Sequence, residues 1–215
     1  LLAGGTGTRL KPATIGINKH LMPVYNKPMI YYSLSVLMLC KFKEVILISD
    51  PDSEKIYKKI FSNGNHLGMK IRIITQTKAN GIPEAFLICK KYIKNQNVCL
   101  MLGDNFFYGQ GFYKNISKGI NLKKGAFILA YNVQDPKKYA VLEKNKKKII
   151  GIEEKPENPK SNLAIPGIYF FDKNVVNYCK GLTKSKRGEL EIVDLIKIYM
   201  IKKTVTFNEI GRGIS

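Results

Sequence analysis

Cysteine, arginine and long apolar runs are all scarce in this sequence. No two of its four cysteines, at Cys40, Cys89, Cys99 and Cys179, stand close enough for a Cys-x-x-Cys metal or redox motif. Such isolated cysteines are typical of small buried side chains in a reducing cytosol. No apolar run approaches the ~20 residues that a membrane-spanning helix requires. The composition therefore predicts a cytoplasmic protein without a membrane partner.

Arginine is rare although the chain is strongly basic. The chain has 36 Lys and Arg residues against 16 Asp and Glu, which gives a net charge of +20, and the arginines are Arg9, Arg72, Arg187 and Arg212 alone. Strong basicity is one mark of nucleic-acid binding, but arginine is the usual reader of bases and phosphates. Because the lysines are scattered, a solvated surface is favoured. We expect no nucleic-acid partner, and nucleic-acid binding stays as an alternative.

Glycine is concentrated near the start, where residues 1–19 read LLAGGTGTRLKPATIGINK. The apolar opening is typical of a buried strand, and Gly4, Gly5 and Gly7 let consecutive N–H groups converge on one anion. A strand that leads through such a loop into a helix is a phosphate-binding arrangement. Arg9 adds a bidentate cation and Lys19 a point charge. The stretch predicts a nucleoside triphosphate site, and its alternative is a glycine-rich turn that binds nothing.

Two commoner phosphate motifs do not fit this loop. A P-loop requires G-x-x-x-x-G-K-[ST], and no Gly-Lys pair follows the glycines at that spacing. A dinucleotide fingerprint requires G-x-G-x-x-G, but its third glycine position is occupied by Leu10. The loop therefore belongs to neither of these types.

Apolar periodicity predicts alternating strands and helices in the first part of the chain. Expected helices cover 28–41, 53–61 and 83–93, and expected strands cover 1–3, 44–49, 70–75, 98–102 and 125–131. Short strands then follow at 139–143, 148–154 and 167–171, with a helix at 189–201 and a strand at 204–209. Alternation favours a parallel sheet covered on both faces. We predict an α/β fold, a Rossmann-like, mostly parallel doubly wound sheet with a smaller, more antiparallel lobe.

Asp104 follows the apolar segment Val98–Leu102 and Gly103. Ligands of open α/β sheets bind at the carboxyl ends of strands, which would place Asp104 at the same edge as the glycine loop. Mg²⁺ prefers one or two carboxylates together with phosphate oxygens. Asp104 is therefore predicted to be a Mg²⁺ ligand, and its alternative is a turn or helix-capping residue.

A series of motifs along the whole chain resembles the sugar nucleotidyltransferases. They are GGTGTRLKPAT with Lys19, PVYNKPMIYYSL (Pro23–Leu34), LGDNFFYG (Leu102–Gly109), EEKP (Glu153–Pro156), PKSN (Pro159–Asn162), GIYFFD (Gly167–Asp172), RGELEIVD (Arg187–Asp194) and GRG (Gly211–Gly213). Several motifs in the right order are more specific than any one of them. The resemblance implies a single nucleotidyltransferase domain over 1–215, with a nucleotide-binding part at about 1–135 and a sugar-binding lobe at about 136–215. It also implies a homo-oligomer, a tetramer in the family.

The implied reaction is nucleotidyl transfer with Mg²⁺ as cofactor. A sugar 1-phosphate oxygen attacks the α-phosphorus of a nucleoside triphosphate in line, and pyrophosphate leaves. The resemblance implies dTTP and glucose 1-phosphate as substrates and dTDP-glucose, used for cell-surface sugars, as product. Because the nucleophile is already an anion, positioning and charge neutralisation suffice. UTP or another sugar phosphate stays as an alternative, as does a homologue that binds a nucleotide sugar without converting it.

The resemblance also implies site residues, position by position. Implied catalytic residues are Arg9, Lys19 and Asp104, and Asp104 is also the metal ligand. Implied nucleotide contacts are Leu2, Ala3, Gly4, Gly5, Gly7, Thr8, Arg9, Gln76 and Gly81, where the Gln76 amide suits a pyrimidine edge. Implied substrate contacts are Asp104, Ala140, Glu154, Lys155, Asn162, Gly167 and Tyr169.

Four features depart from the family pattern. A second metal-binding Asp is expected soon after GRG, whereas the sequence stops at Ser215, and the sequence also begins inside an expected strand. We therefore expect a chain that is truncated at both ends. Glu84 stands where glutamine is usual, and a carboxylate facing the nucleotide would repel it. Ala140 replaces a glycine, and Pro166 replaces a small polar residue. These departures bear on substrate identity more than on the reaction class.

Overall fold

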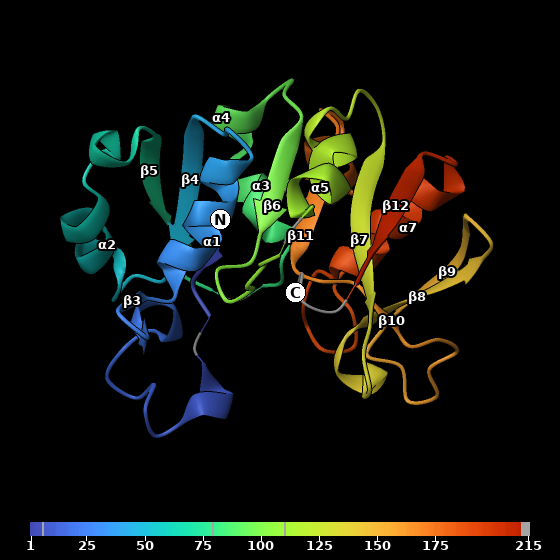
Figure 1. Cartoon of the computed structure of the whole chain (residues 1–215), viewed down its shortest axis with the longest axis horizontal. Helices are drawn as coiled ribbons and strands as arrows, with labels where there is room; N and C mark the ends of the chain where they lie inside the picture. The colour runs from blue at the N-terminus through green and yellow to red at the C-terminus, as the bar shows by residue number, and fades with distance from the viewer. Residues whose placement is uncertain (6, 79, 110, 212–215) are drawn as a thin grey trace. The chain divides into compact units, whose positions relative to one another are not determined.

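The computed structural model describes residues 1–5, 7–78, 80–109 and 111–211. The chain forms two compact units, shown in Figure 1, of which the first comprises residues 1–79 and 101–107 and the second residues 80–100 and 108–215. The chain passes from the second unit back to the first within strand β6 (Val98–Met101). Among the described residues, no helix has the length and apolar character needed to cross a membrane.

The first unit is built on a three-stranded parallel sheet. Its strands stand in the order β1 (Leu2–Ala3), β4 (Glu44–Ser49) and β5 (Lys70–Thr75). After its first residue β4 is a mostly buried, largely apolar run, as expected of an inner parallel strand. The unit's two longer helices are α1 (Ile30–Leu39) and α2 (Glu54–Phe61), and α2 lies beside β5 (Figure 1). Shorter elements are η1 (Thr8–Leu10), η2 (Lys19–Leu21), η3 (Asn65–Leu67) and the hairpin of β2 (Pro23–Val24) and β3 (Lys27–Pro28).

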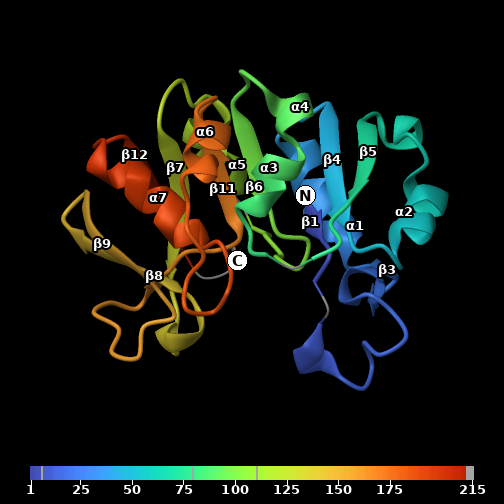
Figure 2. The ribbon, with the colours of Figure 1, turned by 180° about the vertical axis from the view of Figure 1, so that it is seen from behind.

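The second unit is built on a mixed sheet in the order β6-β11-β7-β10-β8-β9, with β12 paired to β7. The antiparallel members are β7 (Ala126–Asn132), β8 (Ala140–Asn145), β9 (Lys148–Glu154), β10 (Leu163–Ala164) and β11 (Ile168–Phe171). β12 (Val205–Ile210) runs parallel to β7. Helix α5 (Phe112–Ile120) covers one face, while α6 (Val175–Lys180) and α7 (Ile192–Ile201) lie on the opposite side, as Figure 2 shows. The remaining helices are α3 (Glu84–Ile88), α4 (Lys90–Ile93) and η4 (Pro136–Lys138).

The core of the second unit surrounds β7, whose residues from Ala126 to Ala130 are fully buried. α5 reaches this core at Gly119, where a Cβ atom would lie 2.5 Å from the Phe170 ring and 2.7 Å from the Phe127 ring. Only a residue without a side chain allows so close an approach between helix and sheet. The core is therefore packed tightly at the point where α5 meets β7 and β11.

The expected α/β fold class is confirmed, with differences in detail. The helix predicted at 83–93 is two helices, α3 and α4, which meet at Cys89. The helix predicted from residue 189 begins at Ile192, because Glu191 has an extended backbone with φ −93° and ψ 135°. The periodicity did not indicate α5 or the parallel pairing of β12 with β7. Such pairing joins segments about 80 residues apart and leaves no local signal in either of them.

Candidate active site

The glycine loop follows β1 at the carboxyl end of the parallel sheet of the first unit. Leu2 and Ala3 form β1, and Ala3 is fully buried. Gly7 has a φ of 59°, and a Cβ atom there would lie 2.9 Å from Thr14 Cγ2. The Thr14 hydroxyl donates to the Gly7 carbonyl at 2.8 Å and so closes the loop against the segment that follows. The predicted Thr8 and Arg9 lie in η1, and the Arg9 side chain falls outside the described part of the structure.

Lys19 and Asp104 form an ion pair beside this loop. Lys19 begins η2, and its side chain passes Gly5, where a Cβ atom would lie 3.2 Å from Lys19 Cε. Asp104 follows β6, and the Gly103 N–H donates to the Leu2 carbonyl at 2.8 Å, which sets the end of this segment next to β1. Two of the three predicted catalytic residues are therefore brought together with the glycine loop.

The charge state of Asp104 depends on Lys19. Burial acts to raise the pKa of Asp104, but the hydrogen bond and charge of Lys19 outweigh it and lower that pKa below its ordinary value. Asn105 also donates to Asp104 Oδ1, at 3.0 Å. Asp104 is thus an anion at neutral pH, available to a cation.

A second polar network, which the sequence analysis did not single out, lies under the glycine loop. Asn18 Nδ2 donates to the Ala3 carbonyl at 2.8 Å and to Asp50 Oδ2 at 2.5 Å. Asn18 Oδ1 accepts from the His20 N–H at 2.8 Å and lies 2.8 Å from His20 Nδ1. Because the Asn18 amide faces acceptors on one side, its oxygen must face donors, so His20 carries its proton on Nδ1. The network fixes the backbone on both sides of Lys19.

His20 is kept neutral by its surroundings. It is buried, and burial together with the charge of Lys19 lowers the pKa of His20 to about 4. Asp50, the carboxylate at the far end of the same network, also accepts from the Ser53 N–H at 2.9 Å. One sequence signal could have pointed to Asp50, because it directly follows the apolar strand β4 as Asp104 follows β6.

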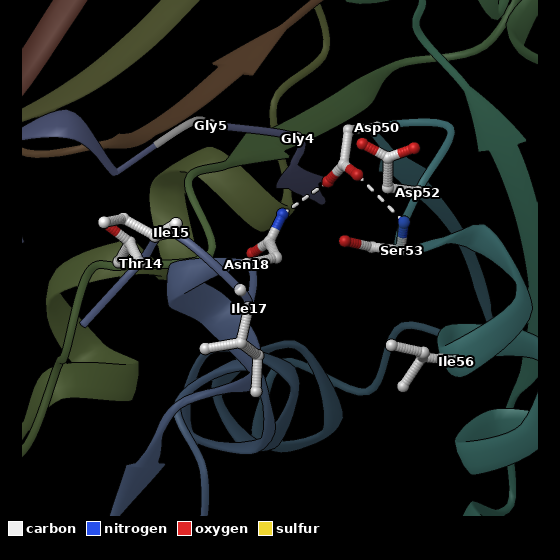
Figure 3. A pocket seen from close by; sticks show the side chains of 11 residues that line it. Gly4, Gly5, Thr14, Ile15, Ile17, Asn18, Asp50, Asp52, Ser53 and Ile56 are labelled. Carbon is white, nitrogen blue, oxygen red and sulfur yellow. Dashed lines mark hydrogen bonds between the residues drawn. The ribbon is translucent and has the colours of Figure 1, made fainter. Parts of the chain in front are cut away.

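A pocket of about 320 Å³ opens between the glycine loop and the start of α2. Figure 3 shows Asn18 and Ser53 both reaching Asp50, with Ile17 and Ile56 on the side away from the glycines. The remaining lining residues are Gly4, Gly5, Thr14, Ile15, Gly16 and Asp52. The pocket therefore joins loop backbone, a carboxylate and apolar side chains at one edge of the sheet.

Gln76, the predicted base contact, extends the same edge. Its N–H donates to the Ser49 carbonyl at 2.8 Å, so Gln76 directly continues the pairing of β5 with β4. Gly4, Asp50 and Gln76 each follow a strand of the parallel sheet, and Leu102, two residues before Asp104, bridges in parallel to Leu2 of β1, so all four residues lie at one edge. The predicted Gly81 lies in the second unit, where it bridges to Leu190.

A cluster of charged side chains in the second unit contains the predicted Glu154 and Lys155. Arg187, not itself a predicted site residue, lies 3.6 Å from Glu154, 3.4 Å from Glu189 and 3.5 Å from Glu191. Lys155 Nζ lies 3.9 Å from Glu154 Oε1. Burial, and to a lesser degree the charge of Glu191, raises the pKa of Glu154 despite both cations.

The other predicted substrate residues lie on neighbouring strands of this sheet. Ala140 in β8 is buried and stands in register with Glu154 of β9. Asn162 accepts the Val133 N–H through its carbonyl, next to β10. Gly167 precedes β11, and Tyr169 within β11 is buried against Phe171. The register thus brings Ala140 to Glu154, while the Tyr169 ring stacks on Phe171 of the same strand.

A glycine loop at the ends of parallel strands, with a lysine and an ionised carboxylate beside it, defines a nucleotide-binding α/β protein. The family model described as "Nucleotidyl transferase" matches residues 1–213. The chain therefore belongs to the nucleotidyl transferase family, and the resemblance seen in its motifs is confirmed.

The chain is also similar in sequence to nucleotidyl transferases that have a specific name. The chain is 43% identical over 216 residues to a glucose-1-phosphate thymidylyltransferase of Neisseria meningitidis, covering 100% of this chain and 75% of the relative. It is 41% identical over 214 residues to an enzyme of the same name from Mycobacterium tuberculosis, covering 99% of this chain and 74% of the relative. These relatives are enzymes, and their similarity extends over essentially the whole of this chain.

Two solved structures have the same fold. A Bacillus anthracis protein assigned as a glucose-1-phosphate thymidylyltransferase, solved with a sucrose, superposes with a TM-score of 0.90 at 38% identity and covers 97% of this chain and 85% of its own. A UDP-glucose pyrophosphorylase solved with UDP-glucose superposes with a TM-score of 0.83 at 19% identity and covers 97% of this chain and 88% of its own, a likeness of fold alone.

Proposed function

We propose that this chain is a glucose-1-phosphate thymidylyltransferase, which joins dTTP and glucose 1-phosphate to give dTDP-glucose and pyrophosphate. The observation that carries the proposal is the ion pair of Lys19 and Asp104 beside the glycine loop. A cation for a triphosphate and an anion for its metal stand together at the loop that would receive the phosphates. The names of the relatives at about 40% identity support the choice of substrates.

Catalysis in this proposal rests on positioning and on neutralising charge. The loop N–H groups, Arg9 and Lys19 bind the triphosphate and hold its α-phosphorus for in-line attack. The attacking sugar phosphate is already an anion, so no residue has to remove a proton from it. His20 agrees with this, since its lowered pKa keeps it neutral and its Nδ1 proton faces Asn18. Positive charge near the leaving pyrophosphate stabilises the transition state.

We propose Mg²⁺ as the cofactor and Asp104 as its protein ligand. Among the described residues no three His, Cys, Asp or Glu side chains gather into a metal cage. A single ionised carboxylate at a phosphate loop nevertheless fits Mg²⁺, which commonly takes one or two carboxylates and completes its shell with phosphate oxygens and water. When bound, the ion would supply charge neutralisation at the phosphates.

The sugar phosphate belongs, in our proposal, to the cluster around Glu154. Glu154 would accept hydrogen bonds from hexose hydroxyls, while Lys155 and Arg187 would bind the phosphate. The other residues proposed to contact the sugar phosphate are Ala140, Asn162, Gly167 and Tyr169. The residues proposed to contact the nucleotide, besides Arg9, are Leu2, Ala3, Gly4, Gly5, Gly7, Thr8, Gln76 and Gly81. The same proposal divides the chain into a nucleotide-binding part at about 1–135 and a sugar-binding part at about 136–215. It also includes a homo-tetramer, a cytoplasmic location and a role in dTDP-sugar biosynthesis.

The direct test is pyrophosphate release with dTTP, glucose 1-phosphate and Mg²⁺, run beside UTP and beside the variant Asp104→Ala. We expect release that requires Asp104 and favours dTTP. Equal rates with UTP would contradict the nucleotide assignment but not the reaction. If dTTP bound without any release of pyrophosphate, the chain would be a nucleotide-binding homologue and the proposed activity would be wrong.

A further inference from the structure

Asn80 holds two charged side chains at once. Its Nδ2 donates to Glu84 Oε1 at 2.7 Å, and its Oδ1 accepts from Lys184 Nζ at 2.9 Å. Glu84 is the residue that stands in place of the glutamine usual in the family. Its carboxylate is therefore hydrogen-bonded within the protein, which weakens the expectation that it repels the nucleotide.

The backbone around Asn80 is joined to the segment that precedes α7. The Leu190 N–H donates to the Asn80 carbonyl at 2.8 Å. Gly81 has a φ of 101°, and a Cβ atom there would lie 2.1 Å from the Leu190 carbonyl oxygen. Only glycine permits this conformation and this approach, so the loop at Gly81 and the segment at Leu190 are in direct backbone contact.

The segment that Leu190 closes is a tight turn that carries Arg187. The Ser185 N–H donates to the Glu189 carbonyl at 2.8 Å, and the Gly188 N–H donates to the Ser185 carbonyl at 2.8 Å. The Ser185 hydroxyl accepts from the Arg187 N–H at 3.2 Å and donates to the buried Glu191 at 2.7 Å. These bonds make residues 185–191 one compact piece, and Arg187 extends from it to Glu154 at 3.6 Å.

We propose that Asn80 is a positioning residue that couples the nucleotide-contacting loop at Gly81 to the turn carrying Arg187. The inference rests on the proposed function, in which Gly81 contacts the nucleotide and Arg187 the sugar phosphate. A nucleotide that fixes the position of the loop then also fixes that of the turn, which moves with the loop as one piece, so the sugar phosphate meets an Arg187 that is already placed. Binding of either substrate therefore strengthens binding of the other, because both substrates draw on the position of this joined piece.

A reversal of the hydrogen bond tests this coupling. Asn80→Asp sets two carboxylates against each other, whereas the double variant Asn80→Asp with Glu84→Gln restores one donor and one acceptor and keeps the net charge. We expect Asn80→Asp to raise KM for both dTTP and glucose 1-phosphate roughly tenfold, with kcat changed less than about threefold. We expect the double variant to return both KM values to within about threefold of the parent.

Two lysines near the start of this turn, Lys184 and Lys186, give a matched control. Lys184 donates a hydrogen bond to Asn80. Lys186 stands two residues away, is exposed and has no part in the proposed coupling through Asn80. Lys184→Met should raise both KM values about two- to threefold, because an exposed contact is weak. Lys186→Met should leave both KM values unchanged. A rise in one KM alone in Asn80→Asp, or equal impairment of the single and double variants, would overturn the coupling.

Hydrogen exchange separates this inference from the proposed activity. With dTTP alone, amides of residues 185–190 should exchange more slowly in the parent and in the double variant, but not in Asn80→Asp. Such protection without turnover would leave the coupling standing and the proposed activity wrong. Turnover without any dTTP-dependent protection of the turn would leave the activity standing and overturn the coupling.

Discussion

Lys19 and Asp104 stand 85 positions apart in the sequence and form an ion pair at the end of β1. Their side chains are 21% and 33% exposed, so each charge is partly removed from water and depends on the other. The pairing exists because the Gly103 N–H binds the Leu2 carbonyl and because η2 begins at Lys19. Within the part of the chain that the structure describes, neither residue forms an ion pair with a residue of its own segment.

A double-mutant cycle on this pair separates stability from activity. Lys19→Met and Asp104→Asn should each lower the free energy of unfolding by about 2 kcal/mol, because each leaves a partly buried charge unpaired. Each should also reduce pyrophosphate release at least about 100-fold. In the double variant we expect part of the stability to return but no activity. Recovery of activity in the double variant would show that the pair is structural only.

Glu154 and Glu153 are neighbours on β9 with different surroundings, which makes them a matched pair. Glu154 lies in the Arg187 cluster, whereas Glu153 is exposed. Glu154→Gln should raise KM for glucose 1-phosphate about tenfold, measured at saturating dTTP, because a charged hydrogen-bond acceptor is lost. Glu153→Gln should leave it unchanged. Equal effects of the two variants would argue against a sugar-binding role for Glu154.

The stability of the free protein should depend on pH through His20. Its folded-state pKa of about 4 lies below the ordinary value of 6.5, so the unfolded chain binds more protons between these two values. The free energy of unfolding should therefore rise as the pH increases from about 4 to 6.5 and then level off, a difference on the order of 3 kcal/mol. Chemical denaturation at several pH values measures it.

Two histidine variants isolate this contribution. His20→Gln should make the pH dependence between pH 4 and 6.5 shallower, because the contribution of this group is gone. His66 is the chain's other histidine and is exposed, so His66→Gln should keep the slope of the parent protein. A slope in His20→Gln equal to that of the parent protein would assign the titration to another group.

Gly119 and Gly181 provide a packing test in the second unit. At Gly119 a Cβ atom would lie 2.5 Å from the Phe170 ring, whereas at Gly181 the nearest atom is 3.7 Å away. Gly119→Ala should lower the free energy of unfolding by about 2 kcal/mol through overpacking. Gly181→Ala should change it by less than about 0.5 kcal/mol. Thermal or urea unfolding measures both, and equal changes would contradict the packing assigned to α5.

The sequence by itself determined the features that local chemistry specifies. Apolar runs such as EVILIS indicated the strands, the amphipathic pattern at 53–61 indicated α2, and the motifs indicated the nucleotidyl transferase family. It also indicated Gly4, Gly5, Lys19 and Asp104 as one phosphate site, since glycines after a strand and a carboxylate after another follow general rules of α/β sheets. These signals lie within short segments, and a short segment carries its own pattern.

Only the tertiary structure decided which distant residues complete each cluster. Asn18, His20 and Asp50 form one network because β4 runs beside β1, and Asn80 reaches Lys184 because Gly81 bridges to Leu190. An asparagine or a histidine has no pattern that reveals its partner, since the partner is set by strand order and by close backbone approach. The same holds for the pKa of His20, which depends on burial and on the charge of Lys19 rather than on the residue type.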